Sequence, residues 1–258
     1  MTGHRARKRF GQNFLVDHQV INRIVRAINP LDGDNLVEIG PGKGALTRLL
    51  LDQCPGLQVI ELDRDLIPAL QAQFTGLAIH QADALKFDFA RLAGTDNPLR
   101  VVGNLPYNIS TPLIFHLLGF ESRIKDMHFM LQKEVVERLA ATPGHKNYGR
   151  LSIMTQYHCQ VDNLFSVGPE CFRPAPKVES AIVRLTPFEQ RPYIANNVGM
   201  FEKLVRVAFQ QRRKTLKNAL RNLNEEIDPA RIDVDLSQRA EKLSVGDYVR
   251  LSNCLWPG

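Results

Sequence analysis

The segment "VVGNLPY", residues 101–107, combines residue types that could do chemistry on the amino group of a nucleobase. An exocyclic amino nitrogen is a poor nucleophile because its lone pair is delocalised into the ring, and two hydrogen-bond acceptors can favour its pyramidal form. The Asn104 side-chain oxygen and the Leu105 carbonyl would be those acceptors, while Pro106 fixes the turn and donates no competing N–H. Tyr107 offers a ring on which an extruded base could stack, worth roughly 1 to 3 kcal/mol. The alternative interpretation is an ordinary turn with a half-buried tyrosine.

Three glycines, Gly40, Gly42 and Gly44, follow another apolar segment in "VEIGPGKGALT", residues 37–47. Between a strand and a helix, glycines let a cofactor lie against the backbone, so this loop is a candidate cofactor site. Its spacing, G-x-G-x-G, differs from the dinucleotide pattern G-x-G-x-x-G and from the phosphate loop G-x-x-x-x-G-K-[ST]. The loop therefore disfavours a pyrophosphate ligand, and a dehydrogenase with it.

Two acidic residues end the next two strand candidates. Glu61 comes about 20 residues after Gly40 and can accept from both hydroxyls of a ribose, and Asp83 can accept from an adenine amino group. Taken singly, each is more often a solvated turn residue or a helix cap. Acids after the second and third strands and glycines after the first all meet at one edge of a parallel sheet, where open α/β folds bind ligands. Their joint placement favours a nucleoside-bearing cofactor.

Short β-branched segments alternate with helical patterns, which is typical of a sheet built from βαβ units. The helical patterns follow Gly44, Asp63, Ser110, Lys133 and Gly149. The strand candidates lie at residues 35–40, 57–63, 77–83, 99–104, 126–132, 163–168 and 180–185. The sequence therefore predicts an α/β fold with a mostly parallel sheet of seven strands, in which Asn104 ends the strand next to the glycine loop.

The end of the chain has a different character. The last two strand candidates are separated only by the Pro-rich loop "GPECFRPAPKVE", which suits a final antiparallel hairpin. Beyond Thr186-Pro187 the strand pattern stops and residues 199–258 are typical of short helices. We therefore expect two domains, 1–186 and 187–258, the second small and all-helical.

Composition excludes several classes of protein. With 258 residues, 44% of them hydrophobic, the chain can bury a core. No segment approaches the roughly 18 apolar residues of a membrane span, and residues 1–10 are too polar for a signal peptide, so a cytoplasmic protein without a membrane partner is expected. The net charge of +6 favours polyanionic partners only weakly.

The cysteines and histidines indicate no metal. Four cysteines form no C-x-x-C pair, and seven histidines show no ligand spacing, so neither a metal site nor a disulfide framework is expected. Cys171, next to Phe172, raises the rival mechanism of a covalent Cys nucleophile. Only Arg173 lies beside it to lower its pKa, which disfavours that mechanism.

Basic residues concentrate in two segments. Residues 201–223 hold seven basic residues against one acid, and on a helix most of them would lie opposite an apolar face. The alternative is a solvated face over a packed stripe. We expect this helix and the N-terminal arm to bind phosphates on either side of the cleft holding Asn104. The predicted contacts are Arg5, Arg7, Lys8 and Arg9 in the arm and Arg206, Arg213, Lys214, Lys217 and Arg221 in the helix.

Seven motifs, in matching order and spacing, resemble the ribosomal RNA adenine N6-dimethyltransferases, and within them the bacterial small-subunit (16S) rRNA enzymes. The resemblance covers essentially the whole chain. The motifs are "FGQNFLVD" (10–17), "EIGPGKGALT" (38–47), "VIELD" (59–63), "QADAL" (81–85), "NLPYNIST" (104–111), "MLQKEVVERL" (130–139) and "FRPAPKVESAIVRL" (172–185).

This resemblance implies a Rossmann-like methyltransferase domain, a small helical domain, and S-adenosylmethionine as the methyl donor. Asn13 and Leu15 would contact the donor, the backbone at Gly40 would approach it closely, and Asn104 would contact both donor and target base. Glu61 would accept from its ribose and Asp83 from its adenine. Phe172 would be a second aromatic face, with the target adenine between it and Tyr107.

The implied substrate is a pair of adjacent adenosines in the 3′-terminal hairpin loop of small-subunit rRNA, dimethylated by a monomeric enzyme within a 30S assembly intermediate. Two alternatives stay open. A large-subunit rRNA adenine methyltransferase of the macrolide-resistance type shares the core motifs. The second alternative is an rRNA-binding assembly factor in which catalysis is secondary.

Overall fold

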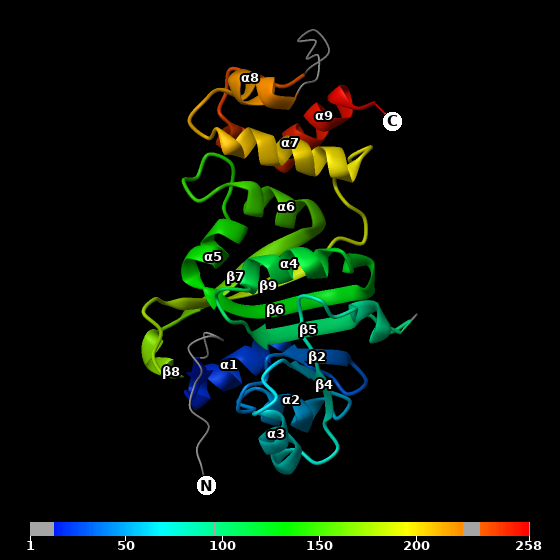
Figure 1. Cartoon of the computed structure of the whole chain (residues 1–258), viewed down its shortest axis with the longest axis vertical. Helices are drawn as coiled ribbons and strands as arrows, with labels where there is room; N and C mark the ends of the chain where they lie inside the picture. Colours follow the sequence, from blue (N-terminus) through cyan, green and yellow to red (C-terminus); the bar gives the residue numbers. More distant parts are fainter. Residues whose placement is uncertain (1–12, 95, 224–232, 258) are drawn as a thin grey trace. The chain divides into compact units, whose positions relative to one another are not determined.

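The computed structural model describes residues 13–94, 96–223 and 233–257, and nine strands form within them. Seven make one sheet (Figure 1), in the order β4-β3-β2-β5-β6-β9-β7. Strands β1 and β8 make a separate two-stranded sheet. The strands are β1 (Phe14–Leu15), β2 (Asn35–Ile39), β3 (Gln58–Glu61), β4 (Ala78–Gln81), β5 (Leu99–Asn104), β6 (Ile124–Gln132), β7 (Cys159–Val167), β8 (Phe172–Arg173) and β9 (Ser180–Pro187).

The predicted strands form the seven-stranded sheet, so the predicted α/β fold is confirmed. Its parallel part runs from β4 through β3, β2 and β5 to β6, and β9 pairs antiparallel with β6. Strand β9 lies between β6 and β7, so the last two predicted strands are neighbours. The sequence does not predict β1 and β8, which pair antiparallel through Phe14 with Arg173 and Leu15 with Phe172.

Helices follow each position where the sequence predicts one, and an additional helix, α1, follows β1. Asp17 caps α1, accepting from the backbone N–H groups of Gln19 (2.9 Å) and Val20 (3.0 Å). The helices are α1 (His18–Ile28), α2 (Thr47–Gln53), α3 (Ile67–Gln73), α4 (Ser110–Leu118), α5 (Lys133–Leu139), α6 (Arg150–His158), α7 (Val198–Gln210), α8 (Leu216–Ala219) and α9 (Val245–Leu255). Short 3-10 helices lie at η2 (Phe89–Arg91), η3 (Glu121–Arg123), η4 (Pro169–Cys171), η5 (Leu220–Leu223) and η7 (Ala240–Lys242).

One face of the sheet is covered by α1, α2 and the β1–β8 pair. The apolar residues of α1 recur at helical spacing, and they pack with the sheet in a single buried cluster. The α1 members are Ile21, Ile24, Val25 and Ile28, and the sheet members include Leu36, Val59, Val102, Met130 and Ile182. This packing fixes the position of β1, whose residues reach the carboxyl edge of the sheet.

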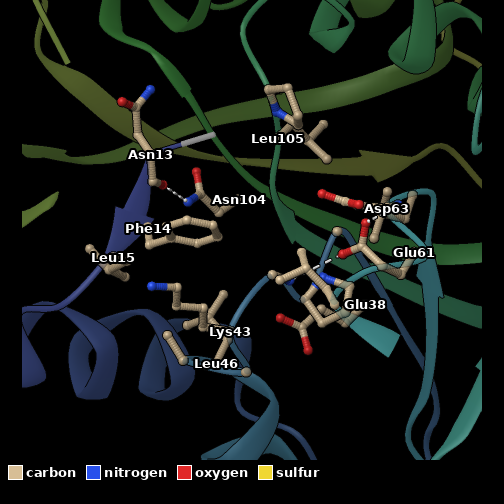
Figure 2. Close-up of a pocket in the computed structure, with 18 of the residues that line it drawn as sticks. Asn13, Phe14, Leu15, Glu38, Lys43, Leu46, Glu61, Asp63, Asn104 and Leu105 are labelled. Atoms are coloured by element: carbon tan, nitrogen blue, oxygen red, sulfur yellow. Dashed lines mark hydrogen bonds between the residues drawn. The ribbon is translucent and has the colours of Figure 1, made fainter. Parts of the chain in front are cut away.

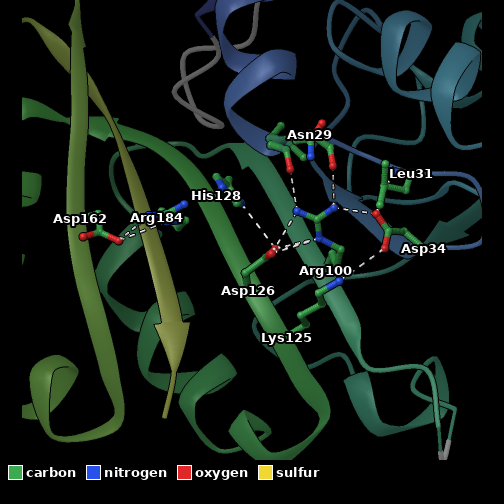
Figure 3. A network of polar contacts seen from close by, with 10 residues as sticks. Asn29, Leu31, Asp34, Arg100, Lys125, Asp126, His128, Asp162 and Arg184 are labelled. Carbon is green, nitrogen blue, oxygen red and sulfur yellow. Dashed lines mark hydrogen bonds and ion pairs between the residues drawn. The ribbon is translucent and has the colours of Figure 1, made fainter. Parts of the chain in front are cut away.

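A buried arginine links α1 to the sheet at the amino edge, where the parallel strands begin (Figure 3). Arg100 in β5 is 6% exposed and donates to the carboxylates of Asp34 (2.6 Å) and Asp126 (3.1 Å). Its Nη atoms also donate to the carbonyls of Ile28 (2.6 Å) and Asn29 (3.1 Å) at the end of α1. These partners satisfy a charge that would otherwise be costly to bury, so the network holds α1, β5 and β6 together.

The described residues group into two compact units. The sheet unit comprises those up to Val136 together with Val161–Pro187, and the helical unit comprises Glu137–Gln160 with those from Phe188 onward. Helix α6 groups with the C-terminal helices because it packs on α7, where the ring centroids of Tyr157 and Phe201 lie 4.5 Å apart. The last change from the sheet unit to the helical unit thus falls at Pro187. Residues 137–160 belong to the helical unit although they precede this point. A division into domains 1–186 and 187–258 stays a prediction.

The basic segment 201–223 is not one helix, which corrects that expectation. Helix α7 ends at Gln210, a turn follows, and Thr215 precedes the short helix α8.

None of the helices in the described part of the chain is both long and apolar enough to span a membrane.

Candidate functional site

A cavity of about 600 Å³ opens at the carboxyl edge of the parallel strands (Figure 2). Such a volume is typical of a site for a small molecule. The glycine loop after β2, the ends of β3 and β5, the turn after β4, and β1 all contribute to its wall. The predicted site residues that line it are Asn13, Leu15, Gly40, Gly42, Glu61, Asp83, Asn104, Leu105 and Tyr107.

The glycine loop supplies open backbone to this cavity. Gly40 has φ +66° and no atom within 4 Å of the place where a Cβ would lie, so ligand atoms can approach its backbone. Gly42 has φ +59°, and a Cβ there would lie 3.2 Å from the ring of Phe14. Phe14 therefore covers the loop from β1, and the Nζ of Lys43 lies 4.7 Å from the centre of the Phe14 ring. Neither Phe14 nor Lys43 was among the site residues predicted from the sequence.

Glu61 is held in place by two backbone amides. Its Oε1 accepts from the N–H of Asp63 at 2.8 Å, and its Oε2 accepts from the N–H of Gly42 at 3.3 Å. The residue is 6% exposed, and burial raises the pKa of its carboxyl above the ordinary value. Each oxygen keeps lone-pair capacity beyond these bonds, so the carboxylate can accept from a diol that lies in the cavity.

A second buried acid, Glu38 in β2, lines the same cavity and was not identified from the sequence. Its Oε2 accepts from the hydroxyl of Thr47 at 2.6 Å. Burial raises the pKa of its carboxyl from 4.5 to about 7, and the nearby Glu61 carboxylate acts in the same direction. The signal in the sequence was an acid inside the apolar segment "LVEIG".

We expect this buried acid to make the ligand-free protein less stable as the pH rises. The pKa of Glu38 is raised in the folded state, so its contribution to stability is greatest below pH 4.5 and is lost as the pH rises to about 7. At about 1.4 kcal/mol per pH unit, the loss is about 3 kcal/mol. Glu38→Gln keeps an acceptor for Thr47 but cannot ionise, so urea unfolding should show the variant more stable than wild type at pH 8 and equal to it below pH 4.5. If the variant and the wild type differ by the same free energy of unfolding at both pH values, the assignment is contradicted.

Two more acids lie where the strands end. Asp83 follows β4 and is half-buried, and its Oδ1 accepts from the N–H of Leu85 at 3.0 Å, which orients the carboxylate in the turn. Asp63, 3% exposed, lines the cavity beside Glu61. Both positions suit recognition of polar atoms of a ligand, and Asp63 was not among the predicted residues.

Asn104 ends β5, and its side chain is oriented by the residue that precedes β1. Its Nδ2 donates to the carbonyl of Asn13 at 3.1 Å, as Figure 2 shows, which uses the donor end of the carboxamide. The acceptor end, Oδ1, is thereby fixed on the opposite side of the group. Leu105 is buried, and its N–H donates to the carbonyl of Met130 at 3.2 Å, which fixes the backbone of the turn. The two predicted acceptors thus come from one rigid turn.

Tyr107 lines the cavity, and its hydroxyl is 2.8 Å from the Oγ of Ser180. Its backbone carbonyl accepts from the hydroxyl of Ser110 at 3.1 Å. The ring is therefore held at both ends, by the main chain and by the phenol. Ser180 was not among the site residues predicted from the sequence.

Phe172 is not brought to the cavity, which differs from the sequence-based expectation. It is 1% exposed in β8 and packs in the apolar cluster with Leu15 and Ile21, because β8 pairs with β1 over α1. A target base between Tyr107 and Phe172 would require Phe172 to leave this packing. Its neighbour Arg173 lines the cavity instead.

Cys171 lacks the surroundings of a nucleophile. It is 7% exposed, and burial raises the pKa of its thiol, with the charges of Asp17 and Glu170 acting in the same direction. A raised pKa disfavours the reactive thiolate.

Among the described residues, no group of three or more His, Cys, Asp or Glu side chains is arranged to hold a metal ion.

The two faces predicted for the basic segment do form, although α7 and α8 are separate. Most of its apolar residues are buried and most of its basic residues are exposed within the helical unit. The exposed ones include Arg206, Arg213, Lys214, Lys217 and Arg221, whereas Arg212 pairs with Glu241 at 2.7 Å. The predicted arm residues Arg5, Arg7, Lys8 and Arg9 lie outside the described residues.

Comparison of sequences gives matches along the whole chain. A family model described as "Ribosomal RNA adenine dimethylase" matches residues 3–256. The protein named "Ribosomal RNA small subunit methyltransferase A" from Saccharophagus degradans is 67% identical over 260 residues, which cover 100% of this chain and 97% of that protein. The protein of the same name from Pseudomonas aeruginosa is 60% identical over 255 residues, covering 98% of this chain and 95% of that protein.

Solved structures agree with the fold. A dimethyladenosine transferase from Plasmodium falciparum superposes with a TM-score of 0.75 at 26% identity, covering 92% of this chain and 95% of that one. The 23S rRNA methyltransferase ErmE superposes with a TM-score of 0.73 at 24% identity, covering 94% and 99%, a likeness of fold alone. The predicted Rossmann-like methyltransferase fold is therefore confirmed.

Proposed function

The chain belongs to the ribosomal RNA adenine dimethylase family, and we propose that it methylates N6 of two adjacent adenosines in the 3′-terminal hairpin loop of small-subunit (16S) rRNA. S-adenosylmethionine would be the donor and each adenosine would receive two methyl groups. The observation that carries the proposal is the cavity, where the fixed carboxamide of Asn104 and the ring of Tyr107 share a wall with Glu61 and the glycine loop.

The residues present fit this donor. The open backbone at Gly40 admits a ligand lying across the loop, and the buried, amide-held carboxylate of Glu61 suits the two ribose hydroxyls. Asp83, oriented by its bond from Leu85, suits the adenine amino group. Asn13 and Leu15 close the other side of the cavity from β1.

S-adenosylmethionine supplies a methyl group on a sulfonium, which an amino nitrogen can attack in line. The protein supplies the orientation of that nitrogen. The Oδ1 of Asn104 and the carbonyl of Leu105 would accept its two N–H groups, which draws the lone pair out of conjugation as positive charge develops on the nitrogen. Tyr107 would hold the extruded base by stacking. Positioning and dipole complementarity then account for most of the acceleration.

The biological setting follows from the substrate. Close relatives carry the name small subunit methyltransferase A, which favours small-subunit rRNA over the large subunit. We propose that the protein acts in the cytoplasm as a monomer on a 30S assembly intermediate. Methyl transfer from labelled donor to purified 30S and 50S subunits, both from a strain lacking the gene, tests this choice. Label confined to 30S subunits is expected, and label mainly in 50S subunits would support the macrolide-resistance type of activity instead.

The exposed basic residues of the helical unit are proposed to bind rRNA phosphates. Phosphate contacts give affinity that falls with salt and do not read the bases. Arg213→Glu combined with Lys217→Glu should weaken rRNA binding, flatten the slope of log K against log salt by about 0.7 to 0.9 per lost contact, and leave donor affinity unchanged. Filter binding across a salt series measures this.

A matched double reversal, Lys86→Glu with Arg91→Glu, makes the same change of net charge at exposed positions of the sheet unit. If both double variants change the slope equally, net charge alone explains the effect. If the Arg213/Lys217 variant binds as wild type does, its two residues form only a solvated face.

A further inference from the structure

We infer that Ser180 is a positioning residue for methyl transfer, because its hydroxyl holds the Tyr107 ring in the orientation that receives the target base. This inference rests on the proposed function of Tyr107 as the stacking surface. It is carried by one contact, the 2.8 Å distance between the Tyr107 hydroxyl and the Ser180 Oγ. Ser180 itself does not line the cavity, so it acts on the base only through Tyr107.

The contact joins the segment that follows β5 to the first residue of β9, and these two strands are not neighbours in the sheet. Tyr107 follows β5, Ser180 is the first residue of β9, and β6 lies between these strands. Asn104 is level with Met130 of β6, and Ser180 is level with Gln132, two residues further along the same strand. The hydroxyl pair therefore reaches past the end of β6, at the edge of the sheet where the cavity opens.

Burial divides Tyr107 into two ends with different roles. Ser180 is 0% exposed, whereas Tyr107 is half-buried. The phenol end of the tyrosine thus lies against a fully buried residue, while the ring contributes to the cavity wall. Burial raises the pKa of the phenol above its ordinary value, which keeps it protonated and able to donate or accept in this pair. Most buried hydroxyl groups are hydrogen-bonded, and at 2.8 Å these two groups satisfy and restrain each other.

The main chain on both sides of the contact is already held. On the side of Ser180, the N–H of Lys133 donates to the Glu179 carbonyl at 3.0 Å, and the Lys133 Nζ is 2.7 Å from the Glu179 Oε2. On the side of Tyr107, the Ser110 hydroxyl donates to its carbonyl at 3.1 Å. Because the main chain is held on both sides, Tyr107 can still move only by rotation about its side-chain torsions. The hydroxyl contact restricts that rotation.

This contact changes the expectation for Tyr107→Phe. Stacking alone requires only the ring, so the sequence predicts that this variant is nearly neutral. With the hydroxyl contact, loss of the phenol should have the same effect as loss of the serine hydroxyl. We expect either change to lower kcat/KM for 30S subunits about fivefold, the scale of one net hydrogen bond.

A double-mutant cycle tests the inference. Initial rates of methyl transfer to 30S subunits would be measured for wild type, Ser180→Ala, Tyr107→Phe and the double variant, with the KM for the donor and the thermal midpoint of each. Ser252→Ala is the matched control, because Ser252 is 2% exposed in α9 and lies in the helical unit. If Ser180→Ala does not fold, Ser180→Cys keeps the volume while weakening the hydrogen bond.

Coupling supports the inference: both single variants and the double variant should be about fivefold slower than wild type, with donor KM unchanged and the control at wild-type rate. Three results would overturn it. The first is a double variant about 25-fold slower than wild type, which is the result for independent sites. The second is a wild-type rate in both single variants. The third is a rate loss that follows the thermal midpoint and also appears in Ser252→Ala. A wild-type protein that methylates neither subunit would instead contradict the proposed function, and the inference with it.

Discussion

Asn104→Ala should lower kcat for methyl transfer to 30S subunits by a factor of about 100 or more while the protein stays folded. The Oδ1 of this residue is fixed because its Nδ2 donates to the Asn13 carbonyl at 3.1 Å. A fixed dipole matters most in the transition state, where charge develops on the adenine nitrogen, so its loss reduces kcat more than binding. Single-turnover rates at saturating 30S subunits, with rRNA affinity measured alongside, give the two quantities separately.

The matched control for this variant is Asn147→Ala. Asn147 belongs to the helical unit, where its Nδ2 donates to Glu137 at 3.2 Å, so the same side chain is truncated away from the cavity. It should turn over at the wild-type rate. An Asn104→Ala enzyme within about threefold of the wild-type kcat would remove Asn104 from the chemistry, since one such dipole contributes far more. A loss that appears only in rRNA affinity would make Asn104 a binding residue.

Glu61→Ala should weaken binding of S-adenosylmethionine by about 1.5 to 3 kcal/mol, the range for hydrogen bonds to a charged group. The carboxylate is 6% exposed and held by the N–H groups of Gly42 and Asp63, so it is placed before the donor arrives. Calorimetric titration of the folded variant measures the change.

Two comparisons separate this effect from a general disturbance of the loop. Glu61→Gln keeps one acceptor oxygen and fills the same space, so its loss of affinity should be the smaller one. Glu189→Ala removes an exposed acid from the helical unit and should bind the donor as wild type does. Unchanged affinity in folded Glu61→Ala would contradict the ribose assignment.

The parallel strands could be predicted because each is a short apolar segment bounded by turn residues. That pattern also predicts the carboxyl edge, and so it brings Gly40, Glu61, Asp83 and Asn104 to one cavity. Helix α1 was missed, although Asp17 is followed by Ile21, Ile24, Val25 and Ile28 at helical spacing. Its start signal and its period were both present in the sequence.

Other features depend on contacts between distant segments, and no local pattern encodes them. The two-residue pairing of β1 with β8 decides that Phe172 is buried and that Phe14 covers Gly42. The contact between Tyr107 and Ser180 spans 73 residues of chain and a whole strand. The break between α7 and α8 falls in the polar residues 210–215, and the apolar residues before and after it would share one face of a single helix, so the period alone predicts one helix.

The most direct test is the chemical identity of the modified nucleotides. Small-subunit rRNA from a strain lacking the gene, before and after incubation of its 30S subunits with the purified protein and S-adenosylmethionine, would be digested and mapped by mass spectrometry. We predict two adjacent N6,N6-dimethyladenosines in the 3′-terminal hairpin loop, absent before incubation and reduced to a few per cent or less when Asn104→Ala is incubated for the time in which the wild-type reaction is just completed. Unmodified adenosines at those positions after incubation with the wild-type protein, or dimethyladenosine only at other positions of this rRNA, would contradict the proposed function.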